Sequence, residues 1–316
     1  MKCAFMASDA VAIPAMRALH ERGLLACAVS NPDKPKGRGK QMSPNPAAEW
    51  VLANNIPLLR PEKSPSHECV DWMESYGVDF IMVMAYGKIL REEIINFPPL
   101  GCLNLHGSLL PHLRGASPIE TAIALGDSKT GVTLMRIVKK MDAGDMCGKI
   151  ETSIGARENG ADLRVKIADL AAKLLCEKLS AIESRALEFV PQYDANATYS
   201  RKLSKADMHL DFNKPARECD CRIRAFGGGL VPWNGAVLKI CEAFAEGNDS
   251  RQNVGEVVEV SGNGICVACS EGMLRITRLQ APCAKEMSAA DFLKGREICK
   301  GEIFASTAQI PLLKIC

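Results

Sequence analysis

Residues 101–120 read GCLNLHGSLLPHLRGASPIE, and this stretch decides the fold. It opens with an apolar run of strand length, 101–106, continues through an irregular loop, and ends at Ser117-Pro-Ile-Glu120. A Ser with Glu three residues later forms a capping box, and a Pro between them suits the first position of a helix. The stretch therefore predicts a strand, a loop and a capped helix, which is the repeating unit of an α/β domain.

The same alternation of apolar strands and amphipathic helices extends over the first 190 residues. Strands are predicted at 2–7, 24–30, 56–59, 79–87, 101–106 and 132–138, and helices at 13–23, 47–55, 69–76 and 160–187. The run 79–87 is apolar throughout, which indicates a central strand buried on both faces. We expect a Rossmann-like, mainly parallel sheet in a domain over 1–188, followed by a linker over 189–205 that lacks periodicity.

The last 110 residues have a different pattern. Residues 255–280 hold three short apolar runs separated by Gly-Asn-Gly and Ser-Glu-Gly turns, and the run 236–244 precedes them. Ser288-Ala-Ala-Asp291 predicts one short helix that ends at Gly295. These signals predict a second domain over 206–316, a small antiparallel β-barrel of the oligonucleotide-binding type.

Composition and charge exclude several classes of protein. Hydrophobic residues make up 47% and charged residues 24% of the 316, an ordinary globular balance that excludes a fibrous or disordered chain. The net charge of +2 gives no overall signal for a polyanionic partner. No apolar run approaches the roughly 20 residues of a membrane span, and the first ten residues lack a secretion signal. We expect a cytoplasmic monomer without a membrane contact.

Fourteen cysteines are spread from Cys3 to Cys316, and most lie in apolar runs. Without a secretion signal we expect reduced thiols that behave as small buried hydrophobes. The alternative is a zinc site built from four of them, Cys219, Cys221, Cys266 and Cys269. Spacing disfavours it, because the first two lie two apart on a predicted helix and the other two lie on opposite faces of a strand. We expect no metal.

The first strand-to-helix turn excludes the common nucleotide sites. It reads Ala7-Ser8-Asp9-Ala10-Val11-Ala12, without the glycines that let a backbone approach a pyrophosphate and with a carboxylate where an anion would lie. No phosphate-binding P-loop motif occurs elsewhere. Neither NAD nor ATP is indicated.

A candidate catalytic group lies in and after the deciding strand. Asn104 and His106 are two residues apart, so they share one face at the carboxyl end of the strand, where ligands bind in parallel sheets. Asp142 follows the strand at 132–138, and its loop can converge with the first. An amide, an imidazole and a carboxylate suit non-covalent acyl transfer, since they stabilise an oxyanion and orient the imidazole. Singly, each has a plain structural alternative, such as capping a turn.

The segments Asn104-Leu-His-Gly-Ser-Leu-Leu-Pro111, Arg114-Gly115 and Asp142-x-Gly144 together resemble the signature of the 10-formyltetrahydrofolate-dependent formyltransferases. The resemblance extends over the chain, through NPDKPKGRGKQMSPNP (31–46), VMAYGKIL (83–90) and MSAADFLKGR (287–296). It implies 10-formyltetrahydrofolate as cosubstrate and, through the basic segment 31–46, methionyl initiator tRNA as acceptor. The α-amine of methionine would attack the formyl carbon directly, through a tetrahedral intermediate, for translation initiation.

The resemblance also implies roles for single residues. Asn104, His106 and Asp142 match the catalytic trio of the family. The residues that match its folate site are Ser108, Leu109, Leu110, Pro111, Tyr86 and Gly87. The residues that match its tRNA-binding insertion are Arg38, Lys34, Lys36 and Lys40. Without the resemblance, this basic segment reads as a solvated surface loop.

Three alternatives share parts of this pattern. A formyltransferase that acts on a sugar-nucleotide amine would use the same trio but would not need the basic segment. A hydrolase that deformylates the folate would need no amine site, and the first turn at Ala7–Val11 departs from the family pattern. A non-catalytic RNA-binding module would need only the barrel. Residues 206–316 hold 13 basic and 14 acidic residues, so tRNA binding there would require local segregation of charge.

Overall fold

The computed structural model describes residues 1–37, 39–247 and 252–314. The chain forms two compact units. The first consists of 1–118, 130–152 and 164–199, and the second of 119–129, 153–163 and 200–316. The second unit thus includes two pieces that interrupt the first unit in the sequence, 119–129 and 153–163. The domain boundaries predicted near 188 and 206 stay a prediction.

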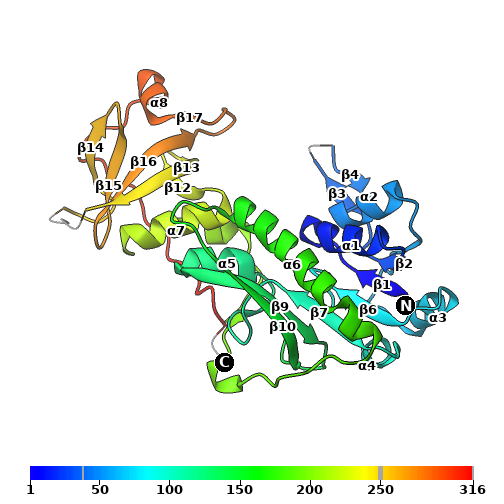
Figure 1. Ribbon diagram of the computed structural model, residues 1–316. Helices are drawn as coiled ribbons and strands as arrows, with labels where there is room; N and C mark the ends of the chain where they lie inside the picture. The colour runs from blue at the N-terminus through cyan, green and yellow to red at the C-terminus, as the bar shows by residue number, and fades with distance from the viewer. Residues whose placement is uncertain (38, 248–251, 315–316) are drawn as a thin grey trace. The chain divides into compact units, whose positions relative to one another are not determined.

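The first unit is built on a seven-stranded sheet with the order β10-β9-β7-β6-β1-β2-β5 (Figure 1). Its strands are β1 (Cys3–Met6), β2 (Leu25–Val29), β5 (Leu58–Leu59), β6 (Phe80–Val83), β7 (Cys102–His106), β9 (Lys129–Arg136) and β10 (Met146–Ser153). The neighbouring strands β5, β2, β1, β6 and β7 of this order pair in parallel, whereas β9 runs antiparallel to β7. The predicted α/β class and mainly parallel sheet are confirmed, and β6 is central as expected.

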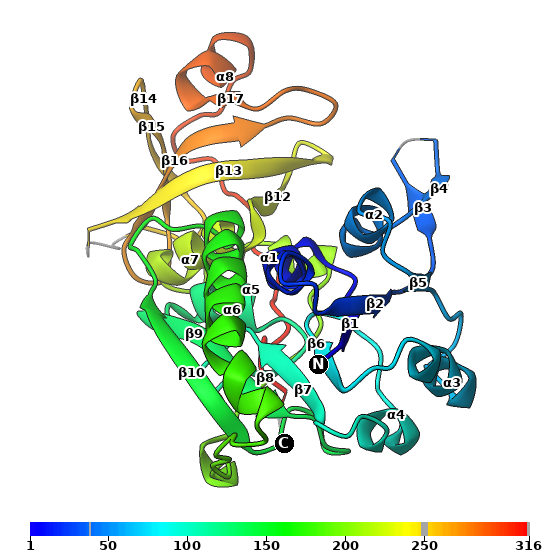
Figure 2. The ribbon, with the colours of Figure 1, turned by 45° about the vertical axis from the view of Figure 1, so that its right-hand side comes forward.

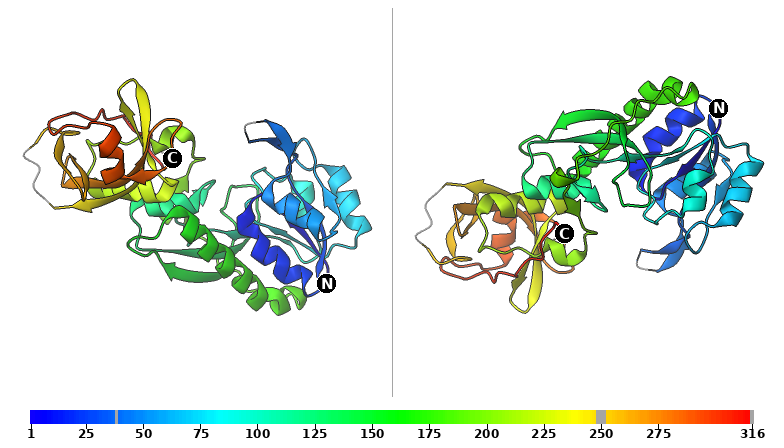
Figure 3. Two further views of the ribbon diagram at one scale, coloured as in Figure 1. Left: turned by 90° about the horizontal axis from the view of Figure 1, so that it is seen from above. Right: turned by 90° about the horizontal axis from the view of Figure 1, so that it is seen from below.

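Helices cover both faces of this sheet. They are η1 (Ala10–Ala12), α1 (Ile13–His20), α2 (Pro46–Ala53), α3 (His67–Ser75), α4 (Glu92–Asn96) and α6 (Gly160–Glu183). Buried residues of α3 and α4, such as Met73 and Ile94, pack against alternate residues of β1 and β6, such as Met6 and Ile81. Helices α1 and α6 lie side by side (Figures 2 and 3). The sheet is therefore wound on two sides, as right-handed crossovers require.

Three features of the first unit differ from the predictions. The polar segment 31–46 holds a hairpin of β3 (Lys34–Lys36) and β4 (Gln41–Ser43), whose turn uses Gly37 and Lys40 at positive φ. The apolar run at 79–87 contributes only β6, because Ala85 takes a φ of 49° and ends the extended backbone. The edge strand β10 and the short helix α4 were not predicted. In β10 only one residue of eight is fully buried, so its apolar signal is weak.

The second unit contains a six-stranded antiparallel sheet. Five of its strands follow the order β12-β13-β16-β15-β14, and the sixth, β17, pairs with β16. Its elements are α5 (Pro118–Leu125), η3 (Lys205–Met208), α7 (Ala216–Phe226), β12 (Gly229–Trp233), β13 (Ala236–Glu246), β14 (Val257–Ser261), β15 (Gly264–Ala268), β16 (Met273–Gln280), β17 (Met287–Ser288) and α8 (Ala289–Gly295). The expected antiparallel domain is confirmed, and the N-cap of α8 is Ser288, whose side chain accepts from the Asp291 amide. The elements η3, β12 and β17 were not predicted.

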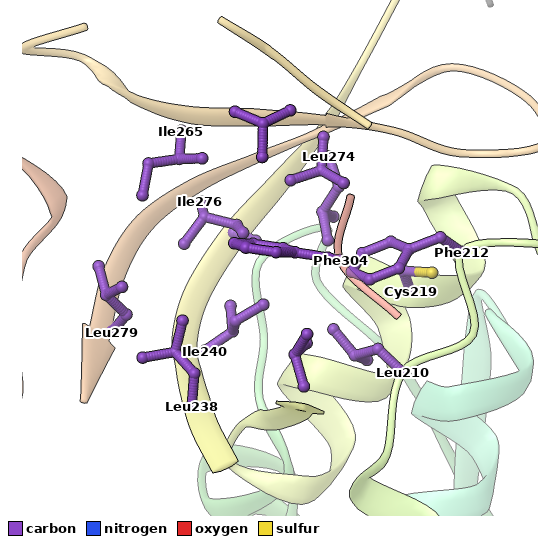
Figure 4. Packing of buried hydrophobic residues seen from close by; sticks show 14 of the residues in the cluster. Leu210, Phe212, Cys219, Leu238, Ile240, Ile265, Leu274, Ile276, Leu279 and Phe304 are labelled. Carbon is purple, nitrogen blue, oxygen red and sulfur yellow. The ribbon is translucent and has the colours of Figure 1, made fainter. Parts of the chain in front are cut away.

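The core of the second unit joins the sheet to α7. Figure 4 shows Leu238, Ile240 and Ile276 of the sheet facing Cys219 of α7, with Phe304 between them. The amphipathic sequence of α7 explains this packing, because Cys219 and Ile223 are four residues apart and share one face. The remaining short elements are β8 (Arg114–Gly115), η2 (Asp194–Asn196) and β11 (Tyr199–Ser200).

Burial accounts for most of the cysteines. All thirteen described cysteines have free thiols, and nine of them are buried. Burial raises the pKa of Cys27 to about 12, so its thiol stays protonated. Cys316 lies outside the described residues. No helix in the described ranges is long and apolar enough to cross a membrane.

Candidate active site

Asn104 and His106 lie at the carboxyl end of β7, on the face expected from the sequence. Asn104 is half-buried and His106 is 6% exposed, while Leu103 and Leu105 face the opposite side. Asn104 and His106 are two residues apart along the strand, which separates their Cα atoms by about 7 Å. The side-chain amide of Asn104 forms no hydrogen bond within the described parts of the chain. It is therefore a donor available to a ligand.

Asp142 meets His106 by a route that strand direction alone does not predict. Because β9 is antiparallel to β7, its last residue, Arg136, pairs with Leu103 near the amino end of β7. The loop after β9 must return about 10 Å along the sheet to reach His106. It does so, and the Oδ2 atom of Asp142 lies 3.8 Å from Nδ1 of His106. The same oxygen accepts a hydrogen bond of 2.7 Å from the Gly115 amide.

The loop that carries Asp142 is held by close backbone contacts. Asp142 has a φ of 48°, in the left-handed region. A Cβ at Gly144 would lie 1.8 Å from the carbonyl oxygen of Arg136, so only glycine fits there. The Nε2 group of Gln192 donates to the carbonyl oxygens of Asp142 and Gly144, at 2.8 and 2.7 Å. These contacts explain the spacing Asp142-x-Gly144 in physical terms.

Gln192 is in turn fixed by Arg114. Its Oε1 atom accepts from Nε and Nη2 of Arg114 at 3.0 and 2.8 Å, and the guanidinium also bonds Tyr199 and Asp194. Arg114 is fully buried, so these bonds compensate its charge in the interior. Sequence reasoning missed Gln192, because it lies in the stretch 189–205 that carries no periodic signal.

The other nitrogen of His106 is also engaged. Nε2 donates to the carbonyl oxygen of Leu113 at 2.8 Å, so Nδ1 is the nitrogen that faces Asp142. Leu113 has a φ of 55°, and the Ser108 hydroxyl donates to the neighbouring carbonyl of His112 at 2.6 Å. A proton gained at Nδ1 would lie against the carboxylate. His106 is thus oriented at both ring nitrogens.

The loop predicted to bind folate, Ser108–Pro111, is anchored by hydrogen bonds to Thr133 and Lys149. The Thr133 hydroxyl donates to the Ser108 carbonyl at 2.7 Å and accepts from the Leu110 amide at 3.1 Å. The Lys149 ammonium donates to the carbonyl of Leu110. Ser108 and Leu110 are buried, whereas Leu109 and Pro111 are partly exposed. The loop therefore has a fixed backbone beside His106.

Tyr86, the other part of the predicted folate site, has a buried ring. Its side chain belongs to the core cluster of the first unit, and burial raises the pKa of its phenol. The phenolic oxygen has no hydrogen-bond partner among the described residues. Its backbone carbonyl accepts from Asn31 at 2.7 Å, and Gly87 follows with a φ of 76°. The Tyr86 ring therefore supports this region from within the hydrophobic core.

The basic segment presents its charges to solvent. Lys34, Lys36 and Lys40 are exposed, and their ammonium groups form no ion pair within the described ranges. Arg38, predicted with them to bind tRNA, lies outside the described residues. The hairpin projects from the rest of the first unit (Figures 1 and 2). Elsewhere in the described chain, no cluster of three or more His, Cys, Asp or Glu residues could hold a metal ion.

Comparison with known proteins identifies the family. The formyl transferase profile matches residues 1–179, and the profile of the formyl transferase C-terminal domain matches 202–297. The methionyl-tRNA formyltransferase of Paraburkholderia phymatum is 35% identical, over 96% of this chain and 97% of the relative. That of Myxococcus xanthus is 38% identical, over 94% and 96%. This chain belongs to the methionyl-tRNA formyltransferase family.

Solved structures of other proteins share the fold of this methionyl-tRNA formyltransferase family member, although their sequence identity to it is low. The N-formyltransferase from Helicobacter canadensis, in complex with folinic acid and dTDP-3-aminofucose, has a TM-score of 0.66 at 16% identity and covers 91% of this chain and 100% of its own. HypX from Aquifex aeolicus, in complex with tetrahydrofolic acid, has a TM-score of 0.59 at 16% identity, over 97% and 51%. The resemblance identified in the sequence is confirmed at the level of the family.

Proposed function

We propose that this enzyme transfers the formyl group of 10-formyltetrahydrofolate to the α-amine of methionyl initiator tRNA. The observation that carries the proposal is the similarity to methionyl-tRNA formyltransferases, which spans both units at 35–38% identity. A sugar-nucleotide formyltransferase shares the fold, but three solved examples of sugar formyltransferases are only 15–17% identical to this chain. We place the reaction in the cytoplasm, where aminoacyl-tRNA is used.

In the proposed reaction the amine lone pair attacks the formyl carbon, and a C–N bond forms. The tetrahedral intermediate carries an oxyanion, which collapses as the bond from carbon to N10 of the folate breaks. The amine loses one proton, and N10 gains one. Asn104 supports the oxyanion, because its amide has no partner in the described protein and can donate to a ligand. Such donors are strongest in a preorganised site.

His106 would supply positive charge near the oxyanion, and His106 and Asp142 together would relay the proton. The imidazole is held between the Leu113 carbonyl and Asp142, so its orientation is fixed before substrate binds. When it is protonated, its positive charge lies beside Asn104 and near the developing oxyanion. Asp142 would hold that imidazolium and assist transfer of the proton that the amine releases.

The substrates are assigned to two surfaces. We propose that folate binds along Ser108–Pro111, whose backbone is anchored by Thr133, with Tyr86 and Gly87 shaping one wall. The β3–β4 hairpin, with Lys34, Lys36, Lys40 and Arg38, would contact tRNA phosphates. Its exposed lysines support this assignment, because phosphate contacts need cations that are not already paired.

An acceptor comparison tests the proposal. The full chain is incubated with 10-formyltetrahydrofolate and either methionyl initiator tRNA, a dTDP-amino sugar, or no acceptor, and formylated product and free tetrahydrofolate are measured. Rapid formylation of the tRNA alone supports the proposal. Formylation of the sugar, or folate turnover without an acceptor, would instead assign the chain to one of the two alternatives.

A further inference from the structure

The second unit contains a cavity of about 660 Å³ whose lining residues all belong to that unit. It lies against one face of α7, the end of α5 and residues 309–313. Apolar groups such as Leu125, Pro215 and Ile310 form much of its wall. The proposed formyl-transfer chemistry uses none of these residues.

A buried arginine with unused hydrogen-bond donors lines this cavity. Arg222 is 5% exposed, and its Nε and Nη1 groups have no hydrogen-bond partner among the described residues. The carboxylate of Glu218 lies 3.7 Å from Nε, which is beyond hydrogen-bond distance. Burying a charge without hydrogen bonds is unfavourable, and proteins rarely do so without a function.

The buried Arg114 and the partly buried Arg224 show the contrast, because both have hydrogen-bond partners. Arg114 is bonded by Gln192, Tyr199 and Asp194. Arg224, two residues along the same helix, donates to Asp220 at 3.1 Å and to the Glu158 carbonyl at 2.8 Å. Arg222 therefore carries donors that the described protein leaves unused.

Further groups on the cavity wall favour a ligand with both negative charge and a donor. Lys214 and Arg217 are exposed on the cavity wall, so three cations, counting Arg222, oppose one carboxylate, Glu218, among its described lining residues. The Oε1 atom of Gln309 is buried and unpartnered as well, whereas its Nε2 group donates to the His209 carbonyl. An acceptor oxygen in that place needs a donor on the ligand, such as a hydroxyl group.

We propose that this cavity binds a phosphate group accompanied by a hydroxyl donor. Two phosphate oxygens would accept from Nη1 and Nη2 of Arg222, the end-on pair of the guanidinium fork, while Nε stays beside Glu218. Lys214 and Arg217 would attract the anion, and the hydroxyl would donate to Gln309. A free phosphorylated small molecule supplies this chemistry, and so does the phosphate–ribose backbone of RNA.

Calorimetric titration of inorganic phosphate into the full chain tests the site, at ionic strength held constant with chloride. We expect one site with a Kd of about 1 mM or tighter. Arg222→Met should weaken binding at least about tenfold, because two charged hydrogen bonds are lost. Arg278→Gln, which removes an exposed cation of the same unit that does not line the cavity, should bind as the wild type does. Absence of saturable binding, or equal binding by Arg222→Met, would overturn the proposal.

Thermal unfolding separates ligand binding from a structural role. In phosphate-free buffer Arg222→Met should have a Tm equal to or above that of the wild type, because a buried charge whose close counter-ion, Glu218, lies beyond hydrogen-bond distance is removed. Phosphate should raise the Tm of the wild type only. A clear loss of Tm in phosphate-free buffer would assign Arg222 to the core and contradict the proposal. Arg222→Lys, which keeps the charge and loses the fork, should bind phosphate with intermediate affinity.

Binding of initiator tRNA distinguishes the two sources. If the phosphate comes from RNA, Arg222→Met should weaken tRNA binding and lower the slope of log K against log salt by about one. If it comes from a free small molecule, tRNA affinity should be unchanged while phosphate binding is lost. Unchanged affinity for both ligands would show that the cavity is not a phosphate site.

Discussion

The carboxylate of Asp142 faces the imidazole of His106 at 3.8 Å, although the strand before Asp142 runs antiparallel to the strand that carries His106. The loop after β9 therefore folds back along the sheet, and Gly115, Gly144 and Gln192 hold it there. The proposed chemistry depends on this return. The geometry of the trio is thus set by contacts that lie outside the trio itself.

Asp142→Asn tests the charge of the carboxylate. The amide oxygen of asparagine can still accept from Gly115, so the loop should keep its place, but the imidazolium loses its counter-ion. We expect kcat for formyl transfer to fall by about 10²-fold with an unchanged Tm. Asp145→Asn, the matched change in the same loop, should leave kcat unaltered. Near-normal kcat in Asp142→Asn would remove this carboxylate from the mechanism.

Gln192 is a positioning residue in this account. Gln192→Leu removes the donor to the Asp142 and Gly144 carbonyls, and it leaves Arg114 short of an acceptor. We expect kcat to fall by about tenfold or more with little change in KM for folate, because a displaced catalytic group costs rate. Stability should fall by about 1–3 kcal/mol.

The control for that variant is Gln280→Leu, which breaks a hydrogen bond to the Ala284 carbonyl in the second unit. It should lower stability without altering kcat. Equal kcat in Gln192→Leu and the wild type would show that Gln192 serves stability alone.

Gly144→Ala tests the close approach of the loop to β9. The added methyl would meet the Arg136 carbonyl at 1.8 Å, so the loop must shift and carry Asp142 with it. We expect a loss of about 1–3 kcal/mol in unfolding free energy, together with reduced kcat. Gly155→Ala, where the nearest atom would be a Glu158 side-chain atom at 3.6 Å, should change stability by less than about 0.5 kcal/mol.

The basic hairpin should act on tRNA binding alone. Lys36→Ala and Arg38→Ala should each raise KM for tRNA and lower the salt slope by about one, with kcat preserved at saturating tRNA. Lys173→Ala on α6, which removes an exposed cation of the same unit, is the control. If KM for tRNA is unchanged in both hairpin variants, the hairpin is an ordinary solvated surface.

Acid stability should reflect the pair formed by Asp207 and Arg201. The guanidinium of Arg201 is the main cause that lowers the pKa of Asp207 to about 2. A carboxyl with a lowered pKa in the folded state stabilises the fold above the unfolded pKa near 3.8, and the gain is lost as pH falls toward 2. The pair should contribute about 2 kcal/mol at neutral pH. In urea titrations between pH 4 and 2, Asp207→Asn should lose less stability than the wild type does.

Local signals explain which elements could be predicted. The strand at β7, the start of α5 at Pro118 and the start of α8 at Ser288 follow from short patterns that act within a few residues. Hairpin β3–β4 is mostly exposed and strand β10 has a single fully buried residue, so their pairing depends on neighbours that periodicity does not reveal.

The residues of the candidate site also differ in how far local sequence signals predict them. Asn104 and His106 share a face because of strand geometry, which the sequence states directly. Asp142 is positioned, and Gln192 and Arg114 hold its loop, through contacts between residues 27 to 80 positions apart in the chain. Arg222 gives no sequence signal at all, since only the folded cavity shows that its donors are unused.

The most direct test of the account is the single-turnover rate of formyl-methionyl-tRNA formation from 10-formyltetrahydrofolate, measured for the wild type, Asn104→Ala, His106→Ala and the double variant. We predict that each single change slows the step by about 10²-fold or more, and that the double variant is only slightly slower, because the two residues act on one oxyanion. A rate near that of the wild type in His106→Ala would contradict the account.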